Sequence, residues 1–129
     1  MRMKRLAMLA LASCAFIPSV AMADCGAYRL VGSWRLYVHP SASSWMACEM
    51  KILPGGKMGR KSSCSGANLP TASATGSIAV ENCIITGQFT VSGQRYVIEH
   101  AGFNVDQSQI FGVMKLGAGR FTEFKSLRQ

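Results

Sequence analysis

Apolar and polar residues alternate with a period of two along much of the chain between residues 34 and 127. The clearest case is the segment 83–91, in which Ile85, Phe89 and Val91 alternate with polar residues. This period is typical of β-strands that bury one face, and no segment beyond residue 23 shows a helical period of useful length. Turn signals recur about every ten residues and bound these segments. The pattern predicts strands over residues 34–39, 46–52, 57–64, 77–80, 83–91, 94–101, 110–116 and 120–127, with a longer loop over 65–75.

Short turns between consecutive strands favour antiparallel pairing of sequence neighbours. A meander of eight half-buried strands can close on itself, which leaves no strand edge unpaired. We therefore expect an all-β, eight-stranded up-and-down barrel formed as a single domain by residues 24–129. A two-sheet β-sandwich is the alternative that the pattern leaves open. The period places Cys83, Gly87 and Gly112 inside the barrel together with bulkier residues such as Trp34 and Phe89, and this set indicates a filled interior.

Residues 1–23 have the pattern of a secretory signal peptide. Three basic residues stand among the first five positions, an apolar stretch covers 6–20, and Ala21-Met22-Ala23 fits the small-x-small pattern before a cleavage site. We expect cleavage before Asp24 and a mature chain in the periplasm or secreted. An alternative is a lipobox at residues 11–14, which would make Cys14 the acylated first residue of an outer-membrane lipoprotein.

Four cysteines follow either processing site, and an even number in an exported chain indicates two disulfides. Three connectivities are possible. Cys48 and Cys64 are equidistant from Gly56, at the centre of a predicted turn, so a hairpin would place them opposite each other. This geometry favours the pairs Cys48–Cys64 and Cys25–Cys83.

Composition excludes several classes of function. After loss of the signal, eleven basic residues outnumber six acidic ones by five, and no basic motif interleaved with aromatic residues points to nucleic acid. No later run of 18 apolar residues predicts a transmembrane segment. The motifs of common hydrolases and nucleotide-binding sites are absent. His39 and His100 are the two histidines, each at a predicted strand end and without an evident third metal ligand. We expect neither enzyme activity nor a cofactor or metal.

A few residues are candidates for contact with a partner. Lys57, Arg60 and Lys61 cluster on one predicted hairpin, as either a docking edge for anions or a solvated turn that guards a strand edge. The loop 65–75 is a second candidate recognition element.

Aromatic side chains form a third candidate, because an exposed apolar patch often marks a binding surface. Trp45 leads this set, since its parity is opposite to that of the apolar face of its strand. Packing beneath the loop 40–44 is the alternative for Trp45. The aromatic residues considered are Tyr37, Trp45, Tyr96, Phe103 and Phe111.

Gly32-Ser33-Trp34 opens the first predicted strand, and a G-x-W ahead of an eight-strand meander resembles the calycin superfamily. The resemblance implies that Trp34 plugs one end of the barrel and that a basic residue of the last strand packs over it. Arg128 is the matching position, ahead of Arg120. A guanidinium over an indole ring is also a favourable cation–π contact.

Within that superfamily, Gly32-Ser33-Trp34-Arg35-Leu36 and the strand that begins at Cys48 resemble bacterial metalloprotease inhibitors of the AprI/Inh type. The resemblance covers residues 31–64 and implies that an N-terminal trunk, here 24–28 with Asp24 first, enters a protease cleft.

These observations favour an exported, non-catalytic protein that binds another exported or envelope protein, as an inhibitor of a hydrolase of the metalloprotease type. Two alternatives remain. The first is a carrier of a small apolar ligand in the barrel interior. The second is a lipid-anchored component of the envelope or of a secretion system, if Cys14 is acylated.

Overall fold

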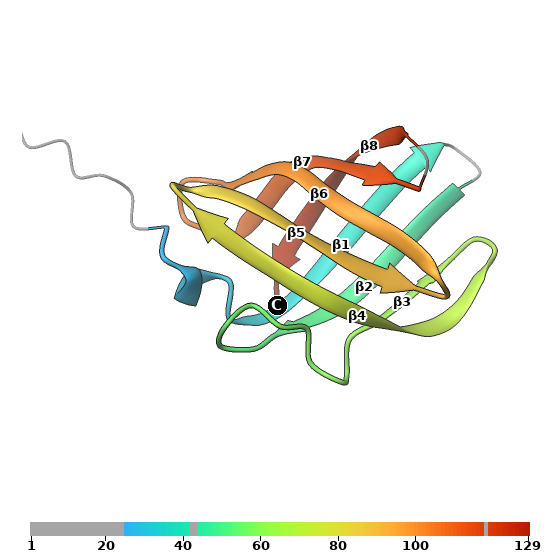
Figure 1. The fold of residues 1–129 in the computed structure, drawn as a ribbon, viewed down its shortest axis with the longest axis horizontal. Helices are drawn as coiled ribbons and strands as arrows, with labels where there is room; N and C mark the ends of the chain where they lie inside the picture. The colour runs from blue at the N-terminus through green and yellow to red at the C-terminus, as the bar shows by residue number, and fades with distance from the viewer. Residues whose placement is uncertain (1–24, 42–43, 118) are drawn as a thin grey trace, which may run out of the picture.

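The computed structural model describes residues 25–41, 44–117 and 119–129. These residues form an all-β protein whose eight strands close into one antiparallel up-and-down barrel, preceded by a single turn of 3₁₀-helix (Figure 1). The barrel prediction is therefore confirmed, and the two-sheet sandwich is excluded. The elements are η1 (Ala27–Arg29), β1 (Gly32–Ser41), β2 (Ser44–Ile52), β3 (Ser63–Gly66), β4 (Leu69–Glu81), β5 (Ile84–Val91), β6 (Gln94–Phe103), β7 (Gln109–Leu116) and β8 (Arg120–Arg128).

Every strand pairs with its sequence neighbours, and β1 also pairs with β8 to close the ring. Trp34 lies opposite Met50 on one side and opposite Arg128 on the other. The last residues of β1 and β7 and the turns after β3 and β5 lie at the right of Figure 1, whereas η1 and the connections after β4 and β6 lie at the left. The barrel therefore has two ends of different construction.

Inward-facing side chains fill the barrel over most of its length. The period of two places large apolar residues inside on each wall, and the fully buried ones include Trp34, Phe89 and Met114. Burial of such side chains stabilises each by roughly 1.5–3 kcal/mol. The largest fully buried side chains are those of Trp34, Phe89, Leu30, Leu36, Ile85, Met114, Val38 and Val91. A filled interior agrees with the expectation from the sequence.

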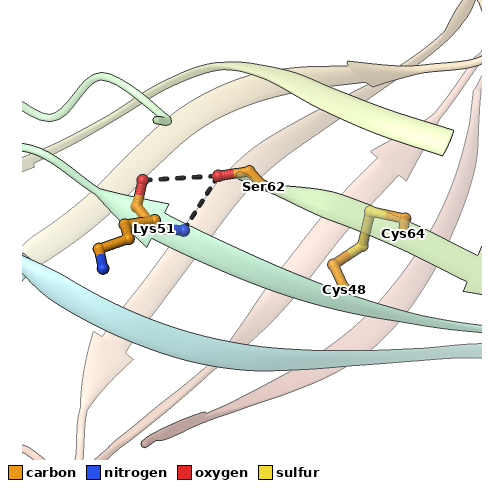
Figure 2. Close-up of a disulfide and its surroundings, with 4 residues drawn as sticks. All are labelled: Cys48, Lys51, Ser62 and Cys64. Carbon is orange, nitrogen blue, oxygen red and sulfur yellow. Dashed lines mark hydrogen bonds between the residues drawn. A yellow bond between two sulfur atoms is a disulfide. The ribbon is translucent and has the colours of Figure 1, made fainter. Parts of the chain in front are cut away.

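The chain between β2 and β4 differs from the prediction. Residues 57–62 form a loop rather than a strand, with isolated bridges at Lys57 and Met58. Gly56, just before this loop, approaches β4 so closely that a Cβ there would lie 2.0 Å from the Ile78 carbonyl oxygen. Buried Ser62 accepts a 3.0 Å hydrogen bond from the Lys51 amide and so substitutes for a strand partner (Figure 2). The predicted loop 65–75 is wrong as well, since β3 and β4 include all but two of its residues. One of its small residues, Ala72, stands opposite Cys64 of the Cys48–Cys64 disulfide in the pairing of β3 with β4.

Both predicted disulfides are present. Cys48 and Cys64 lie opposite each other on β2 and β3, with their Cα atoms 4.0 Å apart and both side chains buried (Figure 2). Cys25 pairs with Cys83 across 58 residues. Cys83 was expected on the inner face of a strand, but it lies exposed in the turn between β4 and β5. Asn82 and Cys83 both have positive φ, as the two-residue turn of a tight hairpin requires.

Candidate functional site: a pocket at the open end of the barrel

One end of the barrel is closed by side chains. Trp34 is 1% exposed, and its Nε1 donates a 2.8 Å hydrogen bond to the Leu30 carbonyl oxygen. The Arg128 guanidinium carbon lies 4.3 Å from the centroid of the Trp34 ring. Arg128 also donates hydrogen bonds to the carbonyl oxygens of Val31 (3.2 Å) and Arg29. We call this region, with η1 and the Cys25–Cys83 disulfide, the closed end.

The position of Gly32 fits this arrangement. Its φ of +131° lies in a region that side chains rarely adopt, and a Cβ there would lie 3.3 Å from Nη1 of Arg128. Gly32 therefore leaves room for the guanidinium above Trp34. Arg120, the other basic residue considered for this contact, begins β8 at the opposite end of the barrel.

The opposite end holds a pocket of about 450 Å³, which we call the mouth pocket. Ligand pockets in proteins typically span about 300–1,000 Å³. Its lining comes from β1 and β2, from the turn between β3 and β4, and from the strand ends of β6, β7 and β8. The lining residues are Val38, Ser44, Trp45, Met46, Ala67, Asn68, Leu69, Gln94, Tyr96, Leu116, Gly117 and Arg120.

The wall of the mouth pocket combines apolar side chains with polar groups of comparable extent. Val38 and Met46 are buried neighbours on β1 and β2, and Leu116 stands opposite Arg120 on β7 and β8. Arg120 is the one charged side chain among the described lining residues. Small-molecule sites likewise combine apolar surface with placed polar groups that orient the ligand.

Tyr96 links the mouth pocket to the filled interior beneath it. Its ring stacks on that of buried Phe89, with centroids 5.0 Å apart and an interplanar angle of 11°. Partial burial raises the pKa of the Tyr96 hydroxyl above its ordinary value. The hydroxyl therefore stays protonated near neutral pH and remains a hydrogen-bond donor. Phe89 and Val91, each 1% exposed, belong to the packed interior below.

Trp45 stands in the lining of the mouth pocket and is 47% exposed. Its backbone is fixed from the neighbouring strand, since the Ala67 amide donates a 3.1 Å hydrogen bond to the Trp45 carbonyl oxygen. Gly66 allows this close approach, because a Cβ there would lie 2.2 Å from the same oxygen. The indole is thus an accessible aromatic group beside the pocket, carried by a backbone position that the neighbouring strand fixes.

The other aromatic candidates do not join Trp45 in one patch. Tyr37 and Phe111 are exposed on the outer wall, where both stand opposite Lys125 in the strand register. Tyr96 lines the mouth pocket, and half-buried Phe103 lies 6.4 Å from Trp34, measured between ring centroids. The predicted set is therefore divided among the outer wall, the mouth pocket and the closed end.

Lys57, Arg60 and Lys61 are exposed on the loop between β2 and β3, away from the mouth pocket. None of the three forms an ion pair or a side-chain hydrogen bond with another residue of the described part of the chain. His39 and His100 are exposed and lie on β1 and β6.

Some predictions lie outside the described residues. These are the signal peptide, Cys14 and Asp24. Within the described ranges, no three His, Cys, Asp or Glu side chains group as metal ligands. Over the same ranges, no helix has the length and apolar character needed to cross a membrane.

Sequence reasoning did not find the mouth pocket. Arg120 was considered only as a partner of Trp34, although it has the same strand parity as buried Thr122 and Phe124. That parity, at the first residue of a strand, is the signal that places Arg120 at the rim of the interior. Tyr96 was considered only as part of an exposed patch.

No protein-family model matches the chain, and no curated protein matches it. Among solved structures, a de novo designed fluorescence-activating β-barrel is similar, with a TM-score of 0.61 and 17% sequence identity. The match covers 80% of this chain and 96% of the designed chain. At this identity the similarity shows the fold alone, a small eight-stranded antiparallel barrel. The resemblance to the metalloprotease inhibitors stays a prediction.

Proposed function

We propose that this protein is a non-catalytic binding barrel that holds a small, largely apolar molecule in its mouth pocket. The observation that carries the proposal is a pocket of about 450 Å³, walled by Val38, Met46, Leu69, Tyr96 and Leu116, at the one end of the barrel that Trp34 does not close. Because side chains fill the interior of the barrel, the ligand binds at the mouth and does not extend through the barrel.

Rigidity supports this proposal. The Cys48–Cys64 disulfide joins β2, the strand that also carries Trp45 and Met46, to β3, and the Cys25–Cys83 disulfide fixes the closed end. A preorganised site loses less conformational entropy on binding. Two disulfides are also compatible with an oxidising, extracytoplasmic location. Export through the predicted signal is part of the proposal.

A role as a metalloprotease inhibitor has less support. The resemblance implies insertion of the N-terminal trunk into a protease cleft. The disulfide at Cys25 ties the chain to the barrel one residue after the predicted cleavage site, which leaves Asp24 alone ahead of the bridge. A lipid anchor at Cys14 is compatible with either role, because Cys25, where the described chain begins, lies at the closed end.

A neutral fluorescent probe tests the proposed function. We expect N-phenyl-1-naphthylamine to bind the mature protein saturably at one site, with a rise in probe emission. Trp45→Ala should weaken this binding about tenfold, because it removes one wall of the pocket. Phe111→Ala is the matched control, since Phe111 is also 47% exposed but lies on the outer wall.

Thermal unfolding of both variants separates binding from stability. Because Trp45 is half exposed, Trp45→Ala should leave the melting temperature close to that of Phe111→Ala. A large fall in melting temperature for Trp45→Ala alone would show that the indole acts in packing. No saturable binding by the wild-type protein, or equal weakening by both variants, would overturn the proposed function.

A further inference from the structure

The carboxylates of the described residues are absent from the lining of the mouth pocket. Glu81 and Asp106 lie in or beside the connections of the closed end, and the other described carboxylates lie on strands with exposed side chains. None of these carboxylates lines the mouth pocket. The described residues of the mouth therefore present a positive side chain to a ligand and no negative one.

Arg120 is the origin of that positive charge. It begins β8 opposite Leu116, and its position has the parity of Thr122 and Phe124, both of which are buried inside the barrel. Its backbone therefore directs the side chain toward the mouth rather than the outer wall, in agreement with its place in the pocket lining.

Arg120 also differs in its contacts from the three arginines of the barrel strands whose side chains have a partner. Arg35 forms an ion pair with Glu49, Arg95 donates to the side-chain oxygen of Gln88, and Arg128 is bound to backbone carbonyl oxygens over Trp34. The side chain of Arg120 has no hydrogen bond or ion pair with any other residue of the described part of the chain. Its donors are thus available to a ligand.

We infer that the mouth pocket selects amphipathic anions, whose carboxylate or phosphate head group pairs with Arg120 while the apolar body lies against Leu116, Tyr96 and Trp45. This inference rests on the proposed function and names the class of ligand. A guanidinium presents paired N–H donors that match the two oxygens of a carboxylate or phosphate. Gln94 and Asn68, also in the lining, add polar groups beside the apolar wall.

Single-chain probes with ten carbons test the inference below their micelle concentrations. Decanoate and decyl phosphate carry the two head groups, decanol is the neutral probe, and decylammonium is the cationic one. Displacement of N-phenyl-1-naphthylamine gives the four affinities. We expect at least one anion to bind about tenfold more tightly than decanol, and decylammonium to bind more weakly than decanol. Raising the salt concentration should weaken anion binding and leave decanol binding unchanged.

Two variants assign the preference to Arg120. Arg120→Gln should reduce the affinity of the anion to that of decanol and leave decanol binding unchanged, and Arg120→Lys should restore part of the preference. Arg95→Gln is the matched control, because Arg95 lies near the same end but bonds to Gln88. The control should retain the full preference for the anion.

The outcomes separate the inference from the proposed function. If decanol binds as tightly as both anions, or if Arg120→Gln does not change the preference, the anion inference fails and the apolar binding function stands. If Arg95→Gln removes the preference as fully as Arg120→Gln, the selectivity is due to general surface charge and the inference fails. If no probe binds, both the inference and the proposed function fail.

Discussion

Arg128 should be the residue of the last strand on which the closed end depends most. Its guanidinium lies 4.3 Å from the Trp34 ring centroid, and it donates hydrogen bonds to the carbonyl oxygens of Val31 and Arg29. These contacts join β8 to the segment that connects η1 with β1. Arg128→Ala removes all of them and leaves the Trp34 ring without its cover.

The size of the loss follows from these contacts. A cation–π contact at an exposed site contributes about 0.5–1 kcal/mol. A hydrogen bond from a charged donor contributes about 1.5–3 kcal/mol when well shielded. Arg128 is exposed, so screening by water reduces each of its two bonds to about 0.5–1 kcal/mol. The expected loss in the free energy of unfolding is therefore about 2 kcal/mol. For a domain of this size that loss corresponds to a fall in melting temperature of roughly 10 °C.

Urea unfolding followed by intrinsic tryptophan emission measures this loss. Arg128→Lys keeps the charge but not the planar fork of donors, and it should recover about half of the lost stability. Arg95→Ala is the control for loss of an exposed arginine with one side-chain partner, and it should cost less than about 1 kcal/mol. If Arg128→Ala unfolds at the same urea concentration as Arg95→Ala, the reasoning about the closed end is refuted.

Three further perturbations test other parts of the structure. Gly56→Ala should lower the free energy of unfolding by about 3 kcal/mol, measured with urea, because the added Cβ meets the backbone of β4 at a residue with positive φ. Gly55→Ala is the control, with a positive φ and no neighbour within 4 Å, and it should lower that free energy by about 1 kcal/mol. Equal losses would contradict the close approach of Gly56 to β4. Replacement of both Cys25 and Cys83 by serine should lower the free energy of unfolding by about 4 kcal/mol, because the disulfide closes a loop across a separation of 58 residues. An unchanged urea midpoint would contradict this expectation. Ser108 donates two hydrogen bonds that hold the pKa of the Asp106 carboxyl below its ordinary value, so Ser108→Ala should raise that pKa in an NMR titration. The stability that these bonds contribute is present at neutral pH and is lost as the pH falls through the lowered pKa of Asp106 in the folded state. If the wild-type protein stayed more stable than Ser108→Ala in strong acid, the role given to these two bonds would be contradicted.

The fold was predictable because the period of two survives in most strands. The segment 83–91 alternates cleanly, and its inward residues Ile85, Phe89 and Val91 are each 1% exposed in the barrel. The turn at Ser92 and Gly93 was also found, since both residues adopt the positive φ that a two-residue hairpin needs. Local pattern and turn chemistry agree there, and consecutive hairpins leave few topologies to consider.

The region between β2 and β4 was not predictable in the same way. Its glycines and small polar residues carry no clear period, so the strand was assigned to 57–64 and the loop to 65–75. In the barrel, residues 57–62 form a loop and most of residues 65–75 lie in strands, because contacts between residues distant in sequence determine the structure of this region. Gly56 meets Ile78, and Ser62 bonds to Lys51. The disulfide was still placed correctly, because a hairpin centred on Gly56 brings the two cysteines together whether the chain between them is strand or loop.

The candidate site depends on which end of each strand its residues occupy. Trp34 and Arg128 were associated through a resemblance that concerns one end of a barrel, and the structure brings them together at that end. To predict the mouth pocket, residues near the starts and ends of β6, β7 and β8 would have to be recognised as neighbours. No local pattern in the sequence relates Tyr96, Leu116 and Arg120. They become neighbours only when the barrel closes and its register is known.

The asymmetry between the two ends connects the fold with the proposed binding. A barrel of eight strands is narrow enough for side chains to fill, so a ligand can be accepted only where that filling stops. Large side chains such as Trp34 occupy the closed end, while Gly117 and Ala67 contribute little volume at the mouth. The apolar wall that remains is exposed to water at a cost, which a ligand of matching surface relieves. Because Arg120 is the charged group among the described residues of that wall, the proposed binding places the anionic head group of the ligand at the rim.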